Sequence, residues 1–395
     1  MEHNPRIIEL RDLSRALRTM GDLDESQAAA ADRLAGRVGQ AMRLDAIDDG
    51  QAITLRQEAE RLGGVVLDGI PGASGPSPRI LVADRDTMER LGDRLGSLGW
   101  KPMGAAIRLA LTAYERTAFA LTFADGGRME LSSETRVMGI LNVTPDSFSE
   151  LATLTSVGQA VETAGGMIDD GADFVDVGGE STRPGAAAVT EAEEVRRVVP
   201  VIRAIKRELA VRVSVDTMKA GVARLAIEAG ADMVNDVSAF SDPAMITVVR
   251  EARVPAIVMH MRGTPQTMQQ DTEYVDLLSS VVGFLRNTVA RAVASGIAED
   301  KMLVDPGLGF GKSASGSLRI LRELSTLRSV GRPLVIGASR KSFIGSALDL
   351  PVNDRLEGSL AIAAQAAWLG AHVIRAHDVG ATKRTTRMID AVRGA

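Results

Sequence analysis

Short apolar runs recur from residue 137 to the carboxyl end, each followed by a polar residue, a loop and a segment with helical spacing. Such runs are typical of buried strands alternating with amphipathic helices. The pattern predicts strands near residues 137–142, 173–178, 211–216, 232–236, 255–260, 302–305, 333–338 and 372–376. It predicts helices near residues 157–170, 191–209, 218–230, 242–252, 275–295, 315–329, 356–369 and 379–393. This repeat predicts an α/β fold, a (β/α)8 TIM barrel of about 250 residues. A doubly wound sheet is the alternative, although it seldom needs so many near-uniform repeats.

Residues 118–135 have a different pattern. Two short alternating segments flank Asp125-Gly-Gly, which predicts a β-hairpin with a tight turn. In a barrel such a hairpin would plug the N-terminal mouth and cover the apolar floor. We therefore place the barrel domain at residues 118–395.

Residues 1–117 are predicted to form a small α/β domain. Helical spacing covers residues 7–20 and 26–42, and a third helix at 51–62 ends at Gly63-Gly64. Strands are predicted near 64–68 and 79–83, and Asp84 can cap a helix at 87–98 that precedes another at 103–116. No convergent set of polar residues is evident, so an accessory or oligomerising role is favoured over a second catalytic site. A chain lacking residues 1–117 is accordingly expected to stay soluble and active.

The amino-acid composition excludes several classes of function for this chain. The net charge of -5 and the small aromatic fraction of 3% argue against general nucleic-acid binding. The absence of cysteine excludes disulfides and thiolate chemistry and fits a reducing cytoplasm. No run reaches the roughly 18 apolar residues of a membrane helix, and the N-terminus lacks a signal-peptide pattern. We expect a cytoplasmic enzyme with small-molecule substrates.

Polar residues stand at the end of every predicted strand, where chemistry collects in TIM barrels. In chain order they are Asn142, the loop Gly178-Gly-Glu-Ser-Thr-Arg-Pro-Gly, Asp216, Asn235 with Asp236, His260, Asp305, the loop Gly337-Ala-Ser-Arg-Lys-Ser, and Arg375 with His377. Helix capping could explain any single aspartate. It does not explain Lys341, Arg375 or His377, which cannot accept a backbone N–H in that role.

The residue types fall into two chemical sets. Asp216, Asn235 and Asp305 offer acceptors and an amide, and Lys341 offers a compact donor, which together suit the amino-pyrimidinone edge of a flat heterocycle. Arg375 and His377, with Asn142 opposite, suit a phosphorylated group, and the Asn142 carbonyl can coordinate Mg2+. The alternative for Lys341 and Arg375 is a structural ion pair with the aspartates.

Two other patterns are weaker. The run 307–313 resembles a P-loop, but Pro306 stands where the first glycine should be, so the Walker pattern fails. The four histidines lack metal-ligand spacing. His260 is as well explained by a hydrogen bond in the core as by a ligand contact.

Taken together, the motifs resemble those of dihydropteroate synthase, the folate-pathway pterin-binding barrel enzyme. The resemblance runs from about residue 118 to the end and rests on 139–149 (Gly-Ile-Leu-Asn-Val-Thr-Pro-Asp-Ser-Phe-Ser), 176–186, Ser214-Val-Asp-Thr, Asn235-Asp, His260-Met, 305–312, Ser339-Arg-Lys-Ser and Arg375-Ala-His-Asp. The first 117 residues look like an extension carried by longer members of the family.

This resemblance implies condensation of 6-hydroxymethyl-7,8-dihydropterin diphosphate with p-aminobenzoate, with Mg2+ as cofactor and a homodimer as the family's usual assembly. The implied pterin residues are Asp216, Asn235, Asp305, Phe310 and Lys341, of which Asp216, Asp305 and Lys341 would be catalytic. Asn142, Arg375 and His377 would bind the diphosphate, with Asn142 at the metal. Phe148, Thr182, Arg183, Pro184 and Ser342 would shape the p-aminobenzoate site.

One segment departs from the family pattern. Where the family has Asp-Gly-Gly after Ser-Phe-Ser, this chain has Glu150-Leu-Ala. Loss of two glycines should stiffen a loop that folds over substrate. A catalytically weak pterin-binding paralogue is therefore one alternative to an active synthase. A pterin-dependent methyltransferase is another, although it has no need of the diphosphate set.

Overall fold

The computed structural model describes residues 3–9, 40–68, 76–143, 157–183 and 185–395. It divides into two compact units, which are described separately. The first contains Met1–Thr117, Leu278–Arg286 and Glu323–Gly331, and the second contains Ala118–Leu277, Asn287–Arg322 and Arg332–Ala395. None of the described helices has the length and apolar character of a membrane span.

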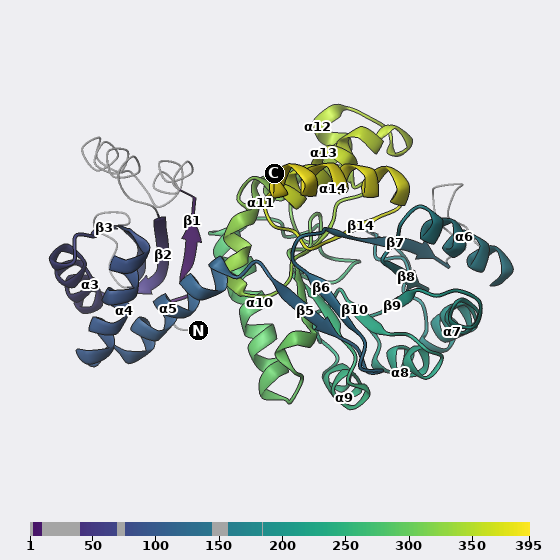
Figure 1. Ribbon diagram of the computed structural model, residues 1–395, viewed down its shortest axis with the longest axis horizontal. Coiled ribbons are helices and arrows are strands. Elements are labelled where there is room, and N and C mark those ends of the chain that lie inside the picture. Colours follow the sequence, from purple (N-terminus) through teal and green to yellow (C-terminus); the bar gives the residue numbers. More distant parts are fainter. Residues whose placement is uncertain (1–2, 10–39, 69–75, 144–156, 184) are drawn as a thin grey trace. The chain divides into compact units, whose positions relative to one another are not determined.

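Eight parallel strands form the centre of the second unit (Figure 1). They are β7 (Arg136–Asn142), β8 (Phe174–Gly178), β9 (Arg212–Asp216), β10 (Met233–Asp236), β11 (Ala256–Met259), β12 (Met302–Asp305), β13 (Val335–Gly337) and β14 (Val373–Ala376). The sheet order is β12-β11-β10-β9-β8-β7-β14-β13, and a parallel bridge between Val304 and Leu334 closes the ring. This closed sheet confirms the (β/α)8 barrel and rules out the doubly wound alternative.

Helices follow the strands and surround them (Figure 1). They are α6 (Val157–Asp169), α7 (Glu191–Glu208), α8 (Ala220–Glu228), α9 (Pro243–Ala252), α10 (Leu277–Ala294), α11 (Ala314–Arg322), α12 (Ser342–Leu348), α13 (Leu356–Trp368) and α14 (Val379–Gly394). The predicted helix at 315–329 is divided, because α11 ends at Arg322 and the 3-10 helix η3 covers Leu324–Val330. The short α12 was not predicted.

A hairpin fills the N-terminal mouth of the barrel, as predicted. Strands β5 (Phe119–Thr122) and β6 (Arg128–Leu131) are antiparallel. Four of the hairpin's side chains join one apolar cluster with residues from the early part of seven barrel strands: Phe119, Leu121, Phe123 and Leu131 with Met138, Phe174, Met233, Ile257, Leu303, Val335 and Val373. Side chains two positions further along a strand face the same way. The barrel interior therefore changes from an apolar floor to a layer that includes Asp176, Asn235, Asp305 and Arg375.

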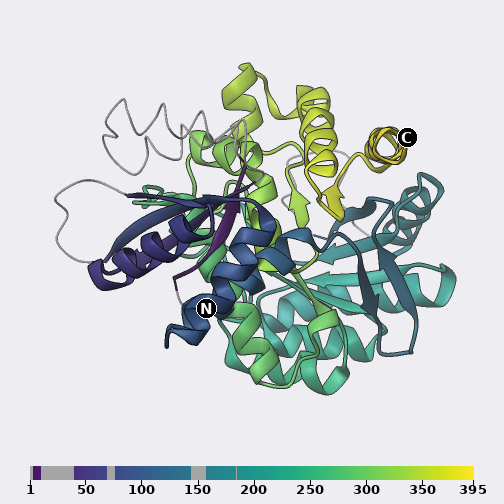
Figure 2. The same cartoon turned by 60° about the vertical axis from the view of Figure 1, so that its left-hand side comes forward.

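The first unit contains an antiparallel sheet in the order β1-β2-β4-β3 (Figure 2). Its strands are β1 (Arg6–Ile8), β2 (Gln40–Ile47), β3 (Val65–Asp68) and β4 (Ser77–Ala83), and its helices are α3 (Asp49–Arg61), α4 (Arg85–Ser97) and α5 (Lys101–Glu115). The predicted cap is present, because the Asp84 side chain accepts the Thr87 N–H. The core joins Met42, Leu44 and Leu81 from strands to side chains of all three helices.

The predicted helices 7–20 and 26–42 are wrong at their described ends, since residues 6–8 and 40–42 are strand. The rest of both segments lies outside the described residues. Strand β2 contains helix-favouring Ala, Met, Arg and Leu, and its pairing with β1 and β4 overrides that preference.

Buried polar contacts link distant segments within the first unit. Arg6 Nη1 lies 2.7 Å from Asp45 Oδ2. Arg286 Nη2 donates to the Ser329 carbonyl at 2.6 Å, and its Nη1 donates to Asn4 Oδ1 at 3.1 Å. The Ile7 N–H donates to Ser329 Oγ at 3.0 Å. Residues 278–286 and 323–331 therefore share one hydrogen-bond network with the N-terminal strand.

Candidate active site

The centre of the site is an arginine that joins aspartates from two other strands. Arg375 on β14 donates from Nε to Asp176 Oδ2 on β8 at 2.6 Å and from Nη2 to Asp216 Oδ2 on β9 at 2.7 Å. Asn235 on β10 donates from Nδ2 to the same Asp176 oxygen at 3.0 Å. Arg375 and Asn235 therefore share Asp176, Asp216 joins them through Arg375, and Arg375 forms the ion pairs with aspartates that the alternative expected.

Sequence reasoning missed Asp176. The side chain is fully buried, and its Oδ1 has no hydrogen-bond partner within the described part of the chain. A signal was available, because Phe174 faces the apolar floor and strand alternation places Asp176 on the same inward face. Asp176 therefore belongs to the same polar layer as the predicted residues.

Burial controls the protonation of the aspartates. It raises the pKa of Asp216 to about 7, against the opposing effect of Arg375. The charges of Asp176 and Glu194 raise that pKa further. Burial also raises the pKa of Asp305, while Lys341 lowers it. The carboxylates are thus held in an environment that disfavours negative charge, which is common at functional sites.

Lys341 brings the loop after β13 to the loop after β12. Its Nζ donates to the Leu308 carbonyl at 2.6 Å and lies 4.6 Å from the centre of the Phe310 ring. Burial lowers the pKa of the Lys341 ammonium to about 8, while the charge of Asp305 raises it. Asp305 Oδ1 accepts the Gly307 N–H at 2.6 Å. Lys341 therefore contacts the Leu308 carbonyl and the Phe310 ring, and its charge acts on the nearby Asp305.

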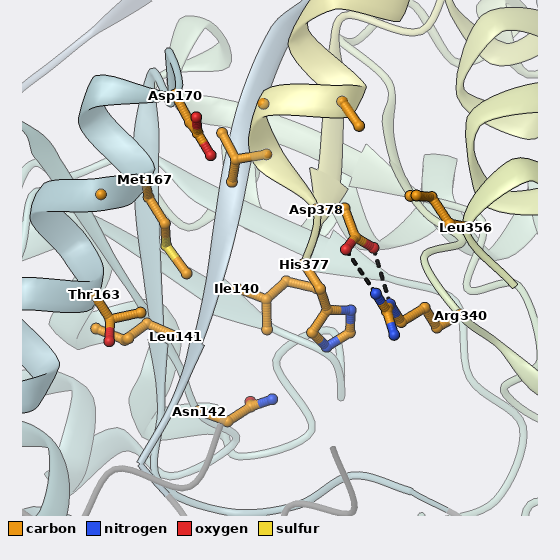
Figure 3. A pocket seen from close by; sticks show the side chains of 14 residues that line it. Ile140, Leu141, Asn142, Thr163, Met167, Asp170, Arg340, Leu356, His377 and Asp378 are labelled. Carbon is orange, nitrogen blue, oxygen red and sulfur yellow. Dashed lines mark hydrogen bonds and ion pairs between the residues drawn. The ribbon is translucent and has the colours of Figure 1, made fainter. Parts of the chain in front are cut away.

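His377 has a fixed partner on the neighbouring loop. Its Nδ1 lies 3.0 Å from Ser339 Oγ, which also accepts the His377 backbone N–H at 3.2 Å. Arg340 makes two hydrogen bonds to Asp378, at 2.9 and 2.7 Å, and these lie beside the histidine (Figure 3). Burial and the charge of Arg375 lower the pKa of His377 to about 4. The imidazole is therefore neutral at pH 7.

A cavity of about 510 Å³ adjoins this histidine (Figure 3). Its polar lining comes from Asn142, His377, Arg340, Asp378, Asp170 and Thr163. Residues of β7, α6, α13 and α14 form the rest, including Ile140, Met167, Leu356 and Val379. Among the predicted residues that the structure describes, the cavity is lined by Asn142 and His377 and not by Asp305, Phe310 or Lys341.

Part of the predicted p-aminobenzoate set can be placed. Thr182 is partly buried and Arg183 is exposed in the loop after β8, and Ser342 is exposed at the start of α12. The base of the β8 loop is anchored, because Glu180 accepts the Val189 N–H at 2.9 Å and also pairs with Lys219. Phe148, Pro184 and the segment Glu150-Leu151-Ala152 lie outside the described residues.

No group of three or more His, Asp or Glu side chains suited to a metal ion occurs in the described ranges. The half-buried Asn142 lines the cavity beside His377. A cation here would need most of its ligands from water or from a bound phosphate. That is the usual situation for Mg2+, which keeps several waters and binds substrate phosphates.

A family model, a curated relative and a solved structure all match this chain as a pterin-binding enzyme. Residues 138–377 match the family model described as pterin binding enzyme. The chain is 45% identical over 273 residues to dihydropteroate synthase of Escherichia coli (strain K12), covering 69% of this chain and 96% of that protein. A crystal structure of the Yersinia pestis dihydropteroate synthase with a sulfonamide drug complex aligns with a TM-score of 0.68 and 42% identity, covering 70% of this chain and all of that one.

A third relative extends over the first unit. It is a probable bifunctional folylpolyglutamate synthase/dihydropteroate synthase of Haloferax volcanii, 36% identical over 380 residues, which covers 93% of this chain and 45% of that protein. The N-terminal extension is therefore also found in another member of the family.

The barrel, its inward polar layer and these matches define an enzyme of the pterin-binding class. Within that class, the chain belongs to the dihydropteroate synthase family, whose members are transferases of folate biosynthesis.

Proposed function

We propose that this site condenses 6-hydroxymethyl-7,8-dihydropterin diphosphate with p-aminobenzoate, giving 7,8-dihydropteroate and pyrophosphate. The observation that carries the proposal is the convergence of Asp305, Lys341 and Phe310 beside the Asp176–Arg375–Asp216 cluster. The part formed by Asp305, Lys341 and Phe310 suits a flat heterocycle. The adjoining N–H donors of Arg375 suit an anion.

The pterin is held by Asp216, Asn235, Asp305 and Lys341, with Phe310 against its ring. Carboxylate oxygens accept its N–H groups, and the Lys341 ammonium donates to its carbonyl or ring nitrogen. Because Asn235 donates to Asp176, the orientation of its amide is set before substrate arrives. The site is therefore pre-organised for the heterocycle.

The diphosphate is held by Asn142, Arg375 and His377. Two of the N–H donors of Arg375 are engaged with carboxylates, and a guanidinium has five, so donors remain for the ligand. A neutral His377 with Nδ1 beside Ser339 can present Nε2 as a hydrogen-bond donor. Mg2+ is the proposed cofactor; Asn142 would contribute one oxygen to it, and the ion would neutralise phosphate charge when bound.

The chemistry is displacement at the pterin methylene carbon. The bond from this carbon to the diphosphate oxygen breaks, and pyrophosphate leaves with the electron pair. The amine nitrogen of p-aminobenzoate forms the new C–N bond and loses one proton to solvent. Positive charge that develops on the pterin is stabilised by the Asp216 carboxylate, so positioning and electrostatics supply most of the catalysis.

The second substrate is proposed to bind at Phe148, Thr182, Arg183, Pro184 and Ser342. The arginine would meet the carboxylate of p-aminobenzoate, since a guanidinium binds that group through two parallel hydrogen bonds. Sulfonamides are proposed to compete at this site.

The N-terminal unit is proposed to be accessory, with no chemistry of its own. A homodimer in the cytoplasm is the proposed assembly and location. Large apolar side chains exposed on α13 and α14 support the dimer, namely Trp368, Met388 and Val392, which are 54%, 62% and 48% exposed.

The test is pyrophosphate release by the full chain with and without p-aminobenzoate, alongside pterin binding. A synthase releases pyrophosphate only when the amine is turned over. A pterin-binding paralogue binds the heterocycle without release. A methyltransferase is indifferent to p-aminobenzoate, and either of these two results would reject the proposal.

A further inference from the structure

The loop between β12 and α11 encloses a buried lysine amine, and burial lowers the pKa of this amine to about 7. Lys312 is only 2% exposed, and its Nζ lies 2.9 Å from His260 Nδ1, 3.1 Å from the His260 carbonyl, 2.9 Å from the Gly307 carbonyl and 2.8 Å from the Phe310 carbonyl. All four partners are neutral. A buried ammonium is costly unless its hydrogens are fully bonded. The loop carbonyls therefore replace water as hydrogen-bond partners of the Lys312 amine.

Glycines allow the loop to close this tightly. Gly307 and Gly311 have φ of 66° and 62°, in the left-handed region. A Cβ on Gly307 would lie 2.1 Å from the His260 carbonyl oxygen, and one on Gly311 would lie 2.7 Å from the Arg262 carbonyl oxygen. The glycine-rich run that resembles a P-loop thus wraps around its own lysine, and its carbonyls turn inward.

The same loop also faces the proposed pterin pocket. The Leu308 carbonyl accepts a hydrogen bond from Lys341 Nζ at 2.6 Å. Leu308 stands between Gly307 and Phe310, whose carbonyls accept from Lys312. The Phe310 ring lies 4.6 Å from that ammonium. Lys312 on one side and Lys341 on the other therefore hold the same short stretch of backbone. Displacement of the inner carbonyls would move the acceptor and the ring that hold Lys341.

We propose that Lys312 is a positioning residue for pterin binding, which acts through the 307–310 backbone on Lys341. This inference rests on the proposed function, because it assumes that Lys341 contacts the pterin. An ammonium only donates, so Lys312 also requires His260 Nδ1 to be unprotonated. That requirement fits the burial of His260, which lowers the pKa of its imidazole to about 3.

The test compares Lys312→Met with Gln269→Ala as the matched control. Gln269 is exposed and donates to the Gly309 carbonyl at 2.8 Å, so its removal also loosens the loop, but from outside. Affinity for 6-hydroxymethylpterin, which lacks the diphosphate, is measured by calorimetry. Lys312→Met should weaken binding by about tenfold or more, and Gln269→Ala by less than about threefold.

A double-mutant cycle distinguishes positioning from general destabilisation. In a Lys341→Met background, Lys312→Met should weaken pterin binding by no more than about threefold, because the residue it positions is gone. Equal losses in both backgrounds, or no loss in either, would overturn the inference. If Lys312→Met does not fold, Lys312→Leu also removes the donors to the carbonyls, and unchanged affinity in that variant would contradict the inference equally.

The two proposals fail differently. A wild-type chain that binds no pterin would reject the proposed function, and this inference with it. A wild-type chain that binds pterin, with affinity unchanged in Lys312→Met, would reject only the role of Lys312.

Discussion

Arg375 and Asp216 form an ion pair across the inside of the barrel, with Nη2 of the arginine 2.7 Å from Oδ2 of the aspartate. The same guanidinium holds Asp176, so one cation faces two carboxylates. Burial raises the pKa of Asp216 even beside this arginine, and the negative charge of Asp176 raises it further. A cationic pterin methylene would relieve the imbalance, which is the physical basis of the role proposed for Asp216.

Replacing Asp216 with Asn should lower turnover by roughly 10²–10³ while the fold survives, because shape is kept and one electrostatic contribution is lost. Steady-state kcat and a thermal unfolding curve are the two measurements. A folded variant with near-normal kcat would remove Asp216 from the mechanism.

The pH profile of kcat/KM should rise as pH increases through about 7. Burial raises the pKa of Asp216 to about 7, against Arg375, and the charges of Asp176, Glu194 and Asp236 raise it further. Below that pH the carboxyl is protonated and cannot stabilise a cation; above it the carboxylate is present. This rise of kcat/KM with pH, the acidic limb of the profile, should be absent in Asp216→Asn. Its persistence there would assign the titration to another group.

Arg375→Ala should weaken binding of the diphosphate-bearing pterin much more than binding of the same pterin without diphosphate. It should also move the acidic limb to higher pH, because Arg375 lowers the pKa of Asp216. Calorimetry with both ligands provides the comparison. Equal losses would mean that Arg375 serves only to hold Asp176 and Asp216 in place.

Much of the fold could be predicted from the sequence, because each barrel strand is a short apolar run with a polar residue at its end. The first two strands of the N-terminal unit could not. Strand β2 has helix-favouring composition, and only its pairing with β1 and β4 makes it a strand. Isolated local preference does not contain that information.

The site was predicted as a set of residues but not as a set of contacts. Arg375 lies 199 residues from Asp176 and 159 from Asp216 in the chain. Only closure of the barrel brings its guanidinium to both carboxylates. Lys312 was set aside with the failed P-loop pattern. One of its hydrogen-bond partners is His260, 52 residues away, and no local motif indicates that contact.

Deleting residues 1–117 was expected from sequence to leave a soluble, active barrel. The contacts within the first unit change that expectation. Arg286 is buried with Asn4 and Ser329, and burial lowers the pKa of its guanidinium to about 9. Deletion removes Asn4 and the cover over residues 278–286 and 323–331. We now expect a lower melting temperature and poorer solubility, partly restored by Arg286→Met. Unchanged melting of the truncated chain would contradict this.

We propose that this chain makes dihydropteroate at the Asp216–Arg375–Lys341 site. The most direct measurement incubates the full chain with dihydropterin diphosphate, Mg2+ and isotopically labelled p-aminobenzoate, and quantifies products by mass spectrometry. We expect labelled dihydropteroate in equal amount to pyrophosphate, with both strongly reduced in Asp216→Asn. Pterin binding without labelled product, or product formation unaffected by Asp216→Asn, would contradict it.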